Sequence, residues 1–359
     1  MSWRSSGEPD AAIPVSPPAC GGSVPEGRGG DSPLRQLRCH LPRERGRKKV
    51  PPLTLLASLP PVRGKYLENA PLGDMTWLRV GGPAEVLFLP ADEADLARFL
   101  AETPDGIPVH ILGAGSNTLV RDGGVPGVVI RLTAPFGKVE AIGGNRLKAG
   151  AAALDRKVAQ TAAKAGIAGL EFFTGVPGAI GGAICMNAGC YGTETRDVLV
   201  EAIALDRSGR RMIIKPDELG YAYRHCDAPG DWIFVEATFE GTSDNPAAIQ
   251  QRMDDITTRR EQTQPIREKT SGSTFKNPDP PGTPDQRKAW KLIDQAGWRG
   301  KRIGGARFSE QHANFLINDG TATAADLEAV GEGARADIKS ATGIDLHWEV
   351  RRMGVEKAK

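Results

Sequence analysis

The sequence predicts an α+β fold built from two regions. Short apolar runs rich in Val and Ile, bounded by Gly, Pro or Asn, recur along the chain and are typical of strands. Between them lie segments whose apolar residues repeat every three or four positions, as on one face of a helix. Glycine and strand patterns prevail up to about residue 245 and helical patterns from 247 onward, so we place a boundary near 241–248, at the turn signal GTSDNP.

Each expected element has its own pattern. Ile249, Met253 and Ile256 share one face of a helix at 247–260, and Thr323 with Asp326 gives the capping-box start of a last helix. The other expected helices are 95–101, 154–165 and 289–296, the last two ended by glycine. The strand-like runs are 85–90, 109–113, 127–132, 146–151, 200–206, 211–215, 233–240, 313–318 and 345–353.

The first 65 residues differ from the rest. They hold 11 Lys and Arg against 5 Asp and Glu, and 11 of the 27 prolines, without sustained periodicity. This composition predicts a disordered Pro/Arg-rich extension over 1–65 that the fold does not need. The alternative is a basic arm that binds nucleic acid or a membrane surface.

Composition limits the other classes of function. A net charge of +2 gives no general case for nucleic acid or an anionic membrane as a partner. The longest uncharged run, 172–193, contains six glycines and Pro177, which is typical of a folded loop and not of a membrane helix. Five cysteines without a CxxC pair indicate a reducing cytoplasm, with neither a disulfide framework nor a metal site.

Two glycine-rich segments indicate a ligand. GAGSN at 113–117 follows a short apolar strand as in a dinucleotide-binding fingerprint, but Thr118 stands where the third glycine belongs and a strand follows. The second segment, 175–192, carries no charge. Consecutive main-chain N–H groups in such turns bind anions, so the pair predicts a nucleotide cofactor held by backbone and shape. The alternative is a pair of tight structural turns.

Seven segments occur in a recognisable order: TWLRVGGPAEVLFLP, LGAGSNTLVRDGGVPGVVI, GLEFFTGVPGAIGGAICMNAGCYG, YAYRH, SGSTFKNP, IGGARFSEQHANFLIN and LHWEVRRMG. Together they resemble the UDP-N-acetylenolpyruvoylglucosamine reductase family over roughly 69–354. The resemblance implies FAD bound in a fold shared with a class of flavin oxidases, and NADPH as the reductant. It implies reduction of the enolpyruvyl ether of UDP-N-acetylglucosamine enolpyruvate to UDP-N-acetylmuramate, a step of peptidoglycan synthesis.

The same resemblance implies a division of the chain. Residues 66–245 would form the FAD-binding domain, 246–345 the substrate-binding domain, and 346–359 a strand and tail that return to the active site. The residues implied for FAD are Gly113, Ala114, Gly115, Ser116, Asn117, Gly175, Pro177, Gly178, Gly181, Gly182, Asn187, Ala188 and Gly189. We further expect a cytoplasmic monomer whose partners are small molecules only.

Three positions match the catalytic pattern of the family. Arg224 is implied to steady the charge that develops on the substrate carboxylate, Glu349 to be its acidic partner, and Ser273 to give a proton to C2. Spacing alone leaves simpler interpretations open, namely a surface ion pair, an outward-facing strand residue and a turn hydroxyl. The pattern Gly-Ser-x-Phe-Lys-Asn-Pro selects Ser273 over Ser271.

Candidates for substrate binding are less specific. Lys276 and Asn277 are candidates for phosphates of the substrate or of NADPH, and Gln311 and His312 for the substrate. His312 could equally be a satisfied polar residue, and Tyr223 either a wall of the site or a core residue.

One spacing bears on the subtype within the family. Only 48 residues lie between Arg224 and Ser273, which resembles the shorter subtype without a tyrosine lid. The other functions to consider are a flavin-dependent oxidase of the same fold and a non-catalytic nucleotide-binding module.

Overall fold

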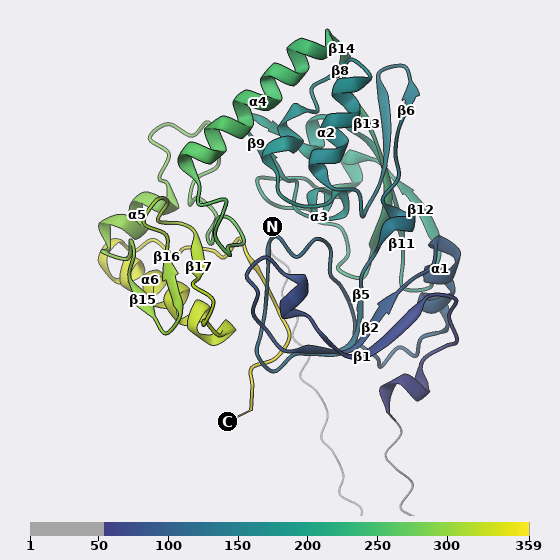
Figure 1. Ribbon diagram of the computed structural model, residues 1–359, viewed down its shortest axis with the longest axis horizontal. Coiled ribbons are helices and arrows are strands. Elements are labelled where there is room, and N and C mark those ends of the chain that lie inside the picture. The colour runs from purple at the N-terminus through teal and green to yellow at the C-terminus, as the bar shows by residue number, and fades with distance from the viewer. Residues whose placement is uncertain (1–53, 359) are drawn as a thin grey trace, which may run out of the picture. The chain divides into compact units, whose positions relative to one another are not determined.

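The computed structural model describes residues 54–358 (Figure 1). The first sheet has the strand order β1 (Lys65–Pro71), β2 (Pro83–Leu89), β5 (Val125–Ile130), β3 (Val109–Ile111). β2, β5 and β3 are parallel and β1 is antiparallel to β2. Helix α1 (Glu93–Glu102) follows β2, and its Leu96, Phe99 and Leu100 are buried against this sheet. The GAGSN segment therefore begins where β3 ends.

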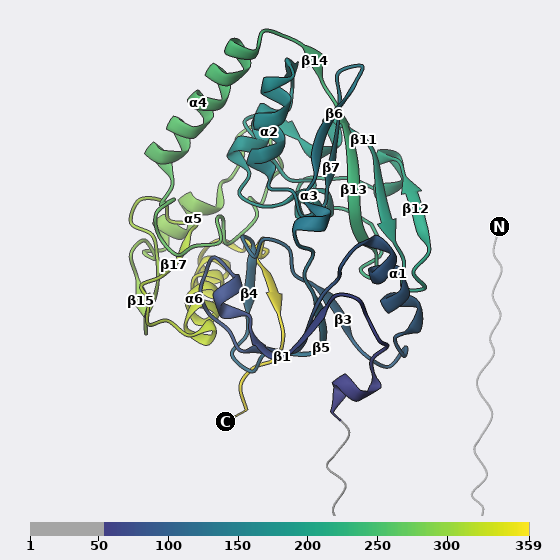
Figure 2. The same cartoon turned by 45° about the vertical axis from the view of Figure 1, so that its right-hand side comes forward.

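The second sheet is antiparallel throughout. Its order is β12 (Arg211–Ile214), β11 (Leu199–Leu205), β13 (Ile233–Glu240), β7 (Arg146–Gly150), β6 (Val139–Gly143). Helices α2 (Asp155–Lys164), α3 (Ile180–Cys185) and α4 (Pro246–Thr263) share one core with β7, β11 and β13. Figures 1 and 2 both show α2 beside α4.

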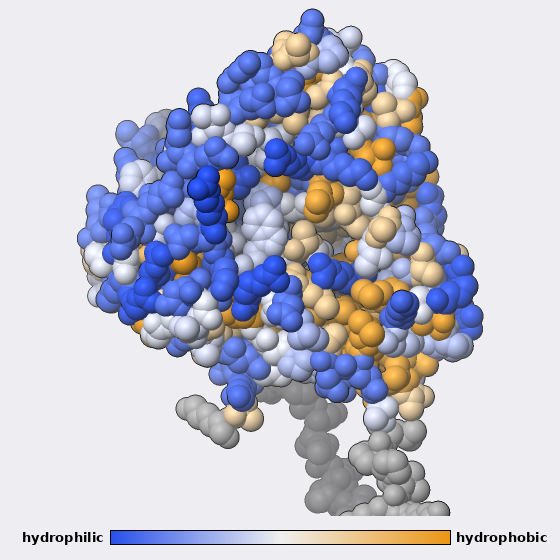
Figure 3. All heavy atoms as spheres, viewed as in Figure 1, coloured by the Kyte–Doolittle hydropathy of each residue, from blue (hydrophilic) through white to orange (hydrophobic). Residues whose placement is uncertain are grey.

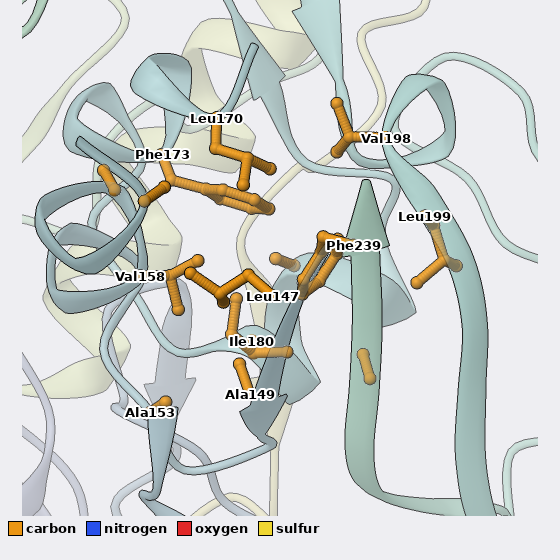
Figure 4. Packing of buried hydrophobic residues seen from close by; sticks show 14 of the residues in the cluster. Leu147, Ala149, Ala153, Val158, Leu170, Phe173, Ile180, Val198, Leu199 and Phe239 are labelled. Atoms are coloured by element: carbon orange, nitrogen blue, oxygen red, sulfur yellow. The ribbon is translucent and has the colours of Figure 1, made fainter. Parts of the chain in front are cut away.

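The core under these helices is built from aliphatic and aromatic side chains. In Figure 4, Leu147, Phe173, Ile180 and Phe239 point toward one another from β7, from the 3-10 helix Glu171–Gly175, from α3 and from β13. The rings of Phe173 and Phe239 meet edge to face with centroids 5.3 Å apart, a favoured aromatic geometry. This core fixes both ends of the second glycine-rich segment.

The C-terminal region is a small antiparallel sheet flanked by two helices. β15 (Arg302–Ile303), β16 (Ala306–Phe308) and β17 (Leu316–Asn318) pair in order, with α5 (Ala289–Gln295) and α6 (Ala324–Thr342) around them. Leu327, Val330, Ala334 and Ile338 form the buried stripe of α6. On the face shown in Figure 3, hydrophilic residues cover most of the surface over these helices.

Short strands tie distant segments together. β18 (Arg351–Met353) pairs in parallel with β4 (Thr118–Val120), directly after GAGSN. β8 (Ile167–Ala168) pairs with β14 (Thr242–Ser243), and β9 (Gly189–Cys190) with β10 (Thr193–Glu194). The remaining 3-10 helices are Leu55–Ser58, Gly73–Met75, Ala134–Phe136, Thr195–Asp197 and Pro216–Leu219.

An ion pair and two helix-capping hydrogen bonds join the C-terminal region to the loop between β4 and β5. The carboxylate of Asp122 accepts hydrogen bonds from the main-chain N–H groups of Ala324 and Ala325, each 3.0 Å away. Arg121 forms a two-pronged pair with Glu328 on α6, at 3.0–3.2 Å. Asp122 thus caps a helix that begins about 200 residues later in the chain.

All five predicted helices are present, with ends shifted by a few residues. α3 was not predicted, because its sequence IGGAIC is rich in glycine and lies in a segment expected to be a loop. The strand expected at 345–353 is regular only over 351–353. The domain limits at 245 and 345 stay a prediction. No helix within residues 54–358 has the length and apolar character that crossing a membrane requires.

The predicted limit of the front extension, residue 65, is wrong. Residues 54–64 pack on the first sheet through Leu55, Leu56, Leu59 and Val62. The carboxylate of Asp95, in the first turn of α1, accepts hydrogen bonds from the N–H groups of Arg63 and Gly64. These contacts are long-range, so local composition did not indicate them; residues 1–53 of the predicted extension lie outside the described residues.

Candidate active site

The GAGSN loop presents unpaired main-chain donors. The N–H groups of Gly113, Ala114, Gly115 and Ser116 donate to no other residue in the described part of the chain. Gly115 has a φ of +66°, and a Cβ there would lie 2.4 Å from the carbonyl oxygen of Met75, so only glycine fits. A Cβ at Gly113 would meet no atom within 4 Å. The loop therefore has the free donors and the open space that a bound phosphate needs.

The second glycine-rich segment is anchored mainly by its own protein contacts. Gly181 and Ala188 donate their N–H groups to the carbonyl oxygens of Ala151 and Ala183, so these two donors are not available to a ligand. A Cβ at Gly182 would meet no atom within 4 Å, which leaves space on that side. Gly175, Pro177 and Gly178 form the bend that leads into α3. This segment therefore offers a ligand open space more than free hydrogen-bond donors.

Asn187 is a structural residue of this segment. It is fully buried with a φ of +46°, and its side-chain amide donates to Glu194 Oε2 (2.8 Å) and to the carbonyl oxygen of Ala222 (3.1 Å). Its Oδ1 accepts from the N–H of Arg196. Asn187 therefore fixes the turn that carries Arg224, and its side chain has no free group for a cofactor.

Asn117 joins both glycine-rich segments to the C-terminal strand. Its side-chain amide donates to the carbonyl oxygen of Glu349 at 3.0 Å and lies 3.6 Å from the sulfur of Met186. Its own carbonyl oxygen accepts from the N–H of Arg351 at 3.0 Å. The predicted cofactor loop and the predicted acid are thus in direct contact.

A pocket of about 410 Å³ lies where these segments meet. Three predicted site residues, Arg224, Lys276 and Glu349, line it. The other lining residues are Cys185, Met186, His225, Cys226, Trp348, Val350, Arg351 and Arg352. Sequence reasoning missed most of these, although several stand next to a motif residue, as His225 does after Arg224.

Arg224 and Glu349 form a largely buried pair. Arg224 Nε lies 3.1 Å from Glu349 Oε1, and the two side chains are 19% and 13% exposed. Arg224 has a φ of +54° in a tight turn, and its guanidinium also donates to the carbonyl oxygen of Gly189 (2.6 Å). Burial raises the pKa of the Glu349 carboxyl, while the charges of Arg224 and Lys276 oppose this rise.

Ser273 lies on the segment beside Glu349. The N–H of Glu349 donates to the carbonyl oxygen of Thr274 (2.8 Å), and Lys276 donates its N–H to the carbonyl oxygen of His347. Ser273 itself is half-buried and is not among the residues that line the pocket. The hydroxyl of its neighbour Ser271 is buried and has no hydrogen-bond partner among the described residues.

Tyr223 and Asn277 lie together beside Arg224. The side-chain amide of Asn277 donates to the Tyr223 hydroxyl at 3.4 Å, and its Oδ1 accepts from the N–H of Ala289 at the start of α5. The guanidinium of Arg224 lies 5.2 Å from the centre of the Tyr223 ring. Tyr223 thus contacts two predicted site residues.

Gln311 and His312 lie outside the pocket lining. The amide of Gln311 donates to the carbonyl oxygens of Glu261 and Gln262 at the end of α4. His312 packs against Phe315 with ring centroids 4.7 Å apart, and its Nδ1 accepts from the N–H of Asn314. Burial lowers the pKa of His312 to about 4. These contacts favour the interpretation of His312 as a satisfied polar residue.

The cysteines of the second segment are poorly suited to be nucleophiles. Burial raises the pKa of the Cys185 thiol to about 11 and that of Cys190 to about 12, so both are neutral at physiological pH. No group of three or more His, Cys, Asp or Glu side chains within residues 54–358 is placed to hold a metal ion.

The fold and these loops define an FAD-dependent oxidoreductase. Residues 84–214 match an FAD binding domain, and residues 264–353 match the C-terminal domain of UDP-N-acetylenolpyruvoylglucosamine reductase. The chain belongs to the UDP-N-acetylenolpyruvoylglucosamine reductase family. The predicted α+β fold with an FAD-binding domain is confirmed, as is the predicted cofactor FAD.

The similarity extends over nearly the whole length of each relative. The UDP-N-acetylenolpyruvoylglucosamine reductase of Maricaulis maris is 71% identical over 302 residues, covering 84% of this chain and 96% of the relative. That of Phenylobacterium zucineum is 63% identical over 298 residues, covering 82% and 97%. The crystal structure of the reductase from Thermus caldophilus has a TM-score of 0.69 at 33% identity, and covers 81% of this chain and 99% of that one.

Proposed function

We propose that Arg224, Glu349 and Ser273 catalyse the reduction of the enolpyruvyl ether of UDP-N-acetylglucosamine enolpyruvate to UDP-N-acetylmuramate. The observation that carries the assignment is the Arg224–Glu349 pair at 3.1 Å in one pocket with Lys276. Arg224, Lys276 and Glu349 come from segments that are far apart in the chain, so the fold, and not local sequence, brings these three residues together. Such a concentration of buried charge in a pocket is typical of catalytic sites.

The cofactor would be held mainly by main chain. The free N–H groups of 113–116 suit the phosphates of FAD, and the open sides of Gly113 and Gly182 leave room for it. Asn187 would act indirectly, because its side-chain amide binds the carbonyl oxygen of Ala222 in the turn that carries Arg224. When bound, FAD would supply C3 of the enolpyruvyl group with hydride that comes from NADPH.

Arg224 would stabilise negative charge on the substrate. Reduction at C3 places charge on C2 and the adjoining carboxylate, and a guanidinium forks onto carboxylate oxygens without losing its own proton. Arg224 is held for this by its bond to Gly189 and by Glu349. Lys276, in the same pocket, would add a second positive charge.

Glu349 would donate a hydrogen bond to the substrate, and Ser273 would donate the proton that C2 takes up. The raised pKa of Glu349 increases its neutral fraction, and a neutral carboxyl can donate a hydrogen bond to an enolate-like oxygen. The Ser273 hydroxyl would give its proton to C2, leaving an alkoxide that solvent reprotonates. Serine is a weak acid, but a carbanion at C2 is a strong base, so the transfer is downhill once the two atoms are close.

Other properties extend this proposal. The small net charge supports small-molecule partners and not nucleic acid, and the cysteine pattern supports a reducing cytoplasm. We also propose that the protein acts as a monomer, and that through peptidoglycan synthesis it serves cell shape and division. Lys276, Tyr223 and Asn277 are the proposed substrate contacts, because Lys276 lines the pocket with Arg224 and Glu349, Tyr223 lies beside Arg224, and Asn277 contacts Tyr223.

The test is Ser273→Ala in stopped-flow measurements of the two half-reactions. Flavin reduction by NADPH should stay near the wild-type rate, while reoxidation by the enolpyruvyl substrate should slow by about 100- to 10,000-fold, the usual range for a lost proton donor. Ser271→Ala is the matched control, since the Ser271 hydroxyl has no hydrogen-bond partner within residues 54–358. Equal slowing of both half-reactions in Ser273→Ala, or equal effects of the two variants, would refute the assigned role.

A further inference from the structure

Asp155 is a buried acid without a protein partner. It is the first residue of α2 and is 1% exposed, and neither of its carboxyl oxygens has a hydrogen-bond partner within residues 54–358. The two other acids that are buried in this part of the chain are satisfied: Asp95 accepts from three main-chain N–H groups, and Glu171 binds Arg252. A buried carboxyl without a partner is costly, which suggests that a ligand satisfies it.

The carboxyl of Asp155 does not cap its own helix. A carboxylate in the first turn of a helix usually accepts from the N–H groups that are free there. In α2, the N–H groups of Lys157 and Val158 donate instead to the carbonyl oxygen of Leu154, at 2.8 and 3.2 Å. The N–H of Asp155 donates to the carbonyl oxygen of Gly178 at 3.2 Å. The start of α2 therefore gives no reason for an acid at this position.

The same carboxyl lies between the two glycine-rich segments. A Cβ added at Gly178, in the second segment, would stand 2.9 Å from Oδ2 of Asp155 and 3.4 Å from Oγ of Ser116. Both side-chain oxygens therefore lie close to one point, which glycine at 178 leaves open. Ser116 belongs to the GAGSN loop, whose N–H groups at 113–116 donate to no other residue in the described part of the chain. Asp155 thus adjoins the loop that is proposed to hold the FAD phosphates.

The surroundings of Asp155 favour its neutral form. Burial raises the pKa of the Asp155 carboxyl well above its ordinary value, because the charged form would lose its hydration without gaining a partner. A neutral carboxyl has an O–H that can donate, whereas a carboxylate can only accept. Beside a phosphate, the neutral form would donate a hydrogen bond and the ionised form would repel a like charge. A protonated Asp155 therefore complements an anion at the GAGSN loop.

We propose that Asp155 is a further FAD-binding residue, which keeps its proton and donates it in a hydrogen bond to a phosphate oxygen of the cofactor. The inference rests on the proposed function, since that function places the FAD phosphates at residues 113–116. The phosphate would satisfy a carboxyl that no residue within 54–358 satisfies. Part of the affinity for FAD then comes from a side chain, in addition to the main-chain donors of the loop.

The first test compares the affinity for FAD in variants of the full chain. Asp155→Ala removes the donor, Asp155→Asn keeps an uncharged donor of nearly the same size, and Asp105→Asn changes an exposed acid as the control. The Kd is measured from flavin fluorescence on dilution of the FAD-loaded protein. Loss of a hydrogen bond to a charged group should raise the Kd roughly 10- to 100-fold in Asp155→Ala, while Asp155→Asn and the control should stay near the wild type. Asp155→Ala that binds as the wild type does, or Asp155→Asn that binds as weakly as Asp155→Ala, would overturn the proposal.

Two spectra of the FAD-loaded protein separate a binding role from a merely structural one. The infrared difference between the wild type and Asp155→Asn should contain the C=O stretch of a protonated carboxylic acid, which a carboxylate lacks. In phosphorus NMR, the signal of one FAD phosphate should shift between the wild type and Asp155→Ala, because one of its oxygens loses a donor.

An ionised Asp155, or FAD phosphate signals that are the same in both proteins, would refute the assignment. If Asp155→Ala does not fold, the infrared comparison still decides, since it needs only Asp155→Asn. None of these outcomes depends on the roles of Arg224, Glu349 or Ser273, because no substrate is present and no reaction is measured.

Discussion

The neutral state of His312 leads to a specific prediction about stability and pH. Its pKa in the folded protein is about 4, against an ordinary value of 6.5, because burial beside Phe315 opposes the charged form and the charge of Arg299 adds to this. The unfolded chain therefore takes up a proton on this ring before the folded one does. The contribution of His312 to stability is fully present above pH 6.5 and is lost as the pH falls toward 4.

The size of the effect follows from the shift. A pKa difference from 6.5 to about 4 is worth roughly 3 kcal/mol, at 1.36 kcal/mol for each unit, and about 2 kcal/mol of it should be lost by pH 5. The perturbation is His312→Asn, which keeps an acceptor for the N–H of Asn314 but cannot be protonated. The variant should be less stable at pH 7 but should lose less stability on acidification.

The assay is urea unfolding followed by circular dichroism at pH 7, 5 and 4, with FAD at one fixed concentration. The quantity of interest is the difference in unfolding free energy between wild type and His312→Asn, because all other titrating groups cancel in it. That difference should shrink by about 3 kcal/mol from pH 7 to pH 4. A difference that stays constant with pH would refute the argument. A large rise in the KM for the substrate at pH 7 would instead favour a binding role.

Two further predictions concern contacts between distant segments. Asp122→Ala should lower the free energy of unfolding by about 1–2 kcal/mol in chemical denaturation, because it removes two hydrogen bonds to the first N–H groups of α6 beyond those of its capping box, whereas Asp105→Ala in an exposed turn should have no effect; equal stability of the two variants would contradict this. Deletion of residues 1–62 should cost about 2–4 kcal/mol relative to deletion of 1–53, because it removes apolar contacts of residues 54–62. Thermal unfolding compares the two deletions, and matching midpoints would count against the packing seen here.

Local sequence patterns predicted the elements that carry a start signal and a regular apolar stripe of their own. The α6 helix combines a capping box at Thr323 and Asp326 with a regular apolar stripe, and its N-terminus was placed to within a residue. α3 was missed because IGGAIC has a low helix propensity, and it forms only since Ile180 and Ile184 are buried in the core of the second sheet. Residues 54–64 were missed for a similar reason, because their partner Asp95 lies about 30 residues away.

The candidate site, too, was only partly predictable from the sequence. Motifs selected Arg224 and Glu349, which are 125 residues apart, and the structure brings them to 3.1 Å. The backbone geometry that aims Arg224 was not predictable, because its positive φ depends on a turn held by Asn187, itself expected to bind the cofactor.

The contact between Asn117 and Glu349 has a consequence for how activity arises during folding. The two residues are 232 positions apart, and closing a loop of that length is among the slow steps of a folding chain. The nucleotide loop joins strands that are close in the sequence, whereas the acid is held beside it by the pairing of β18 with β4. Activity should therefore depend on a long-range contact as well as on the loop itself, because the pairing of β18 with β4 holds Glu349 beside Asn117.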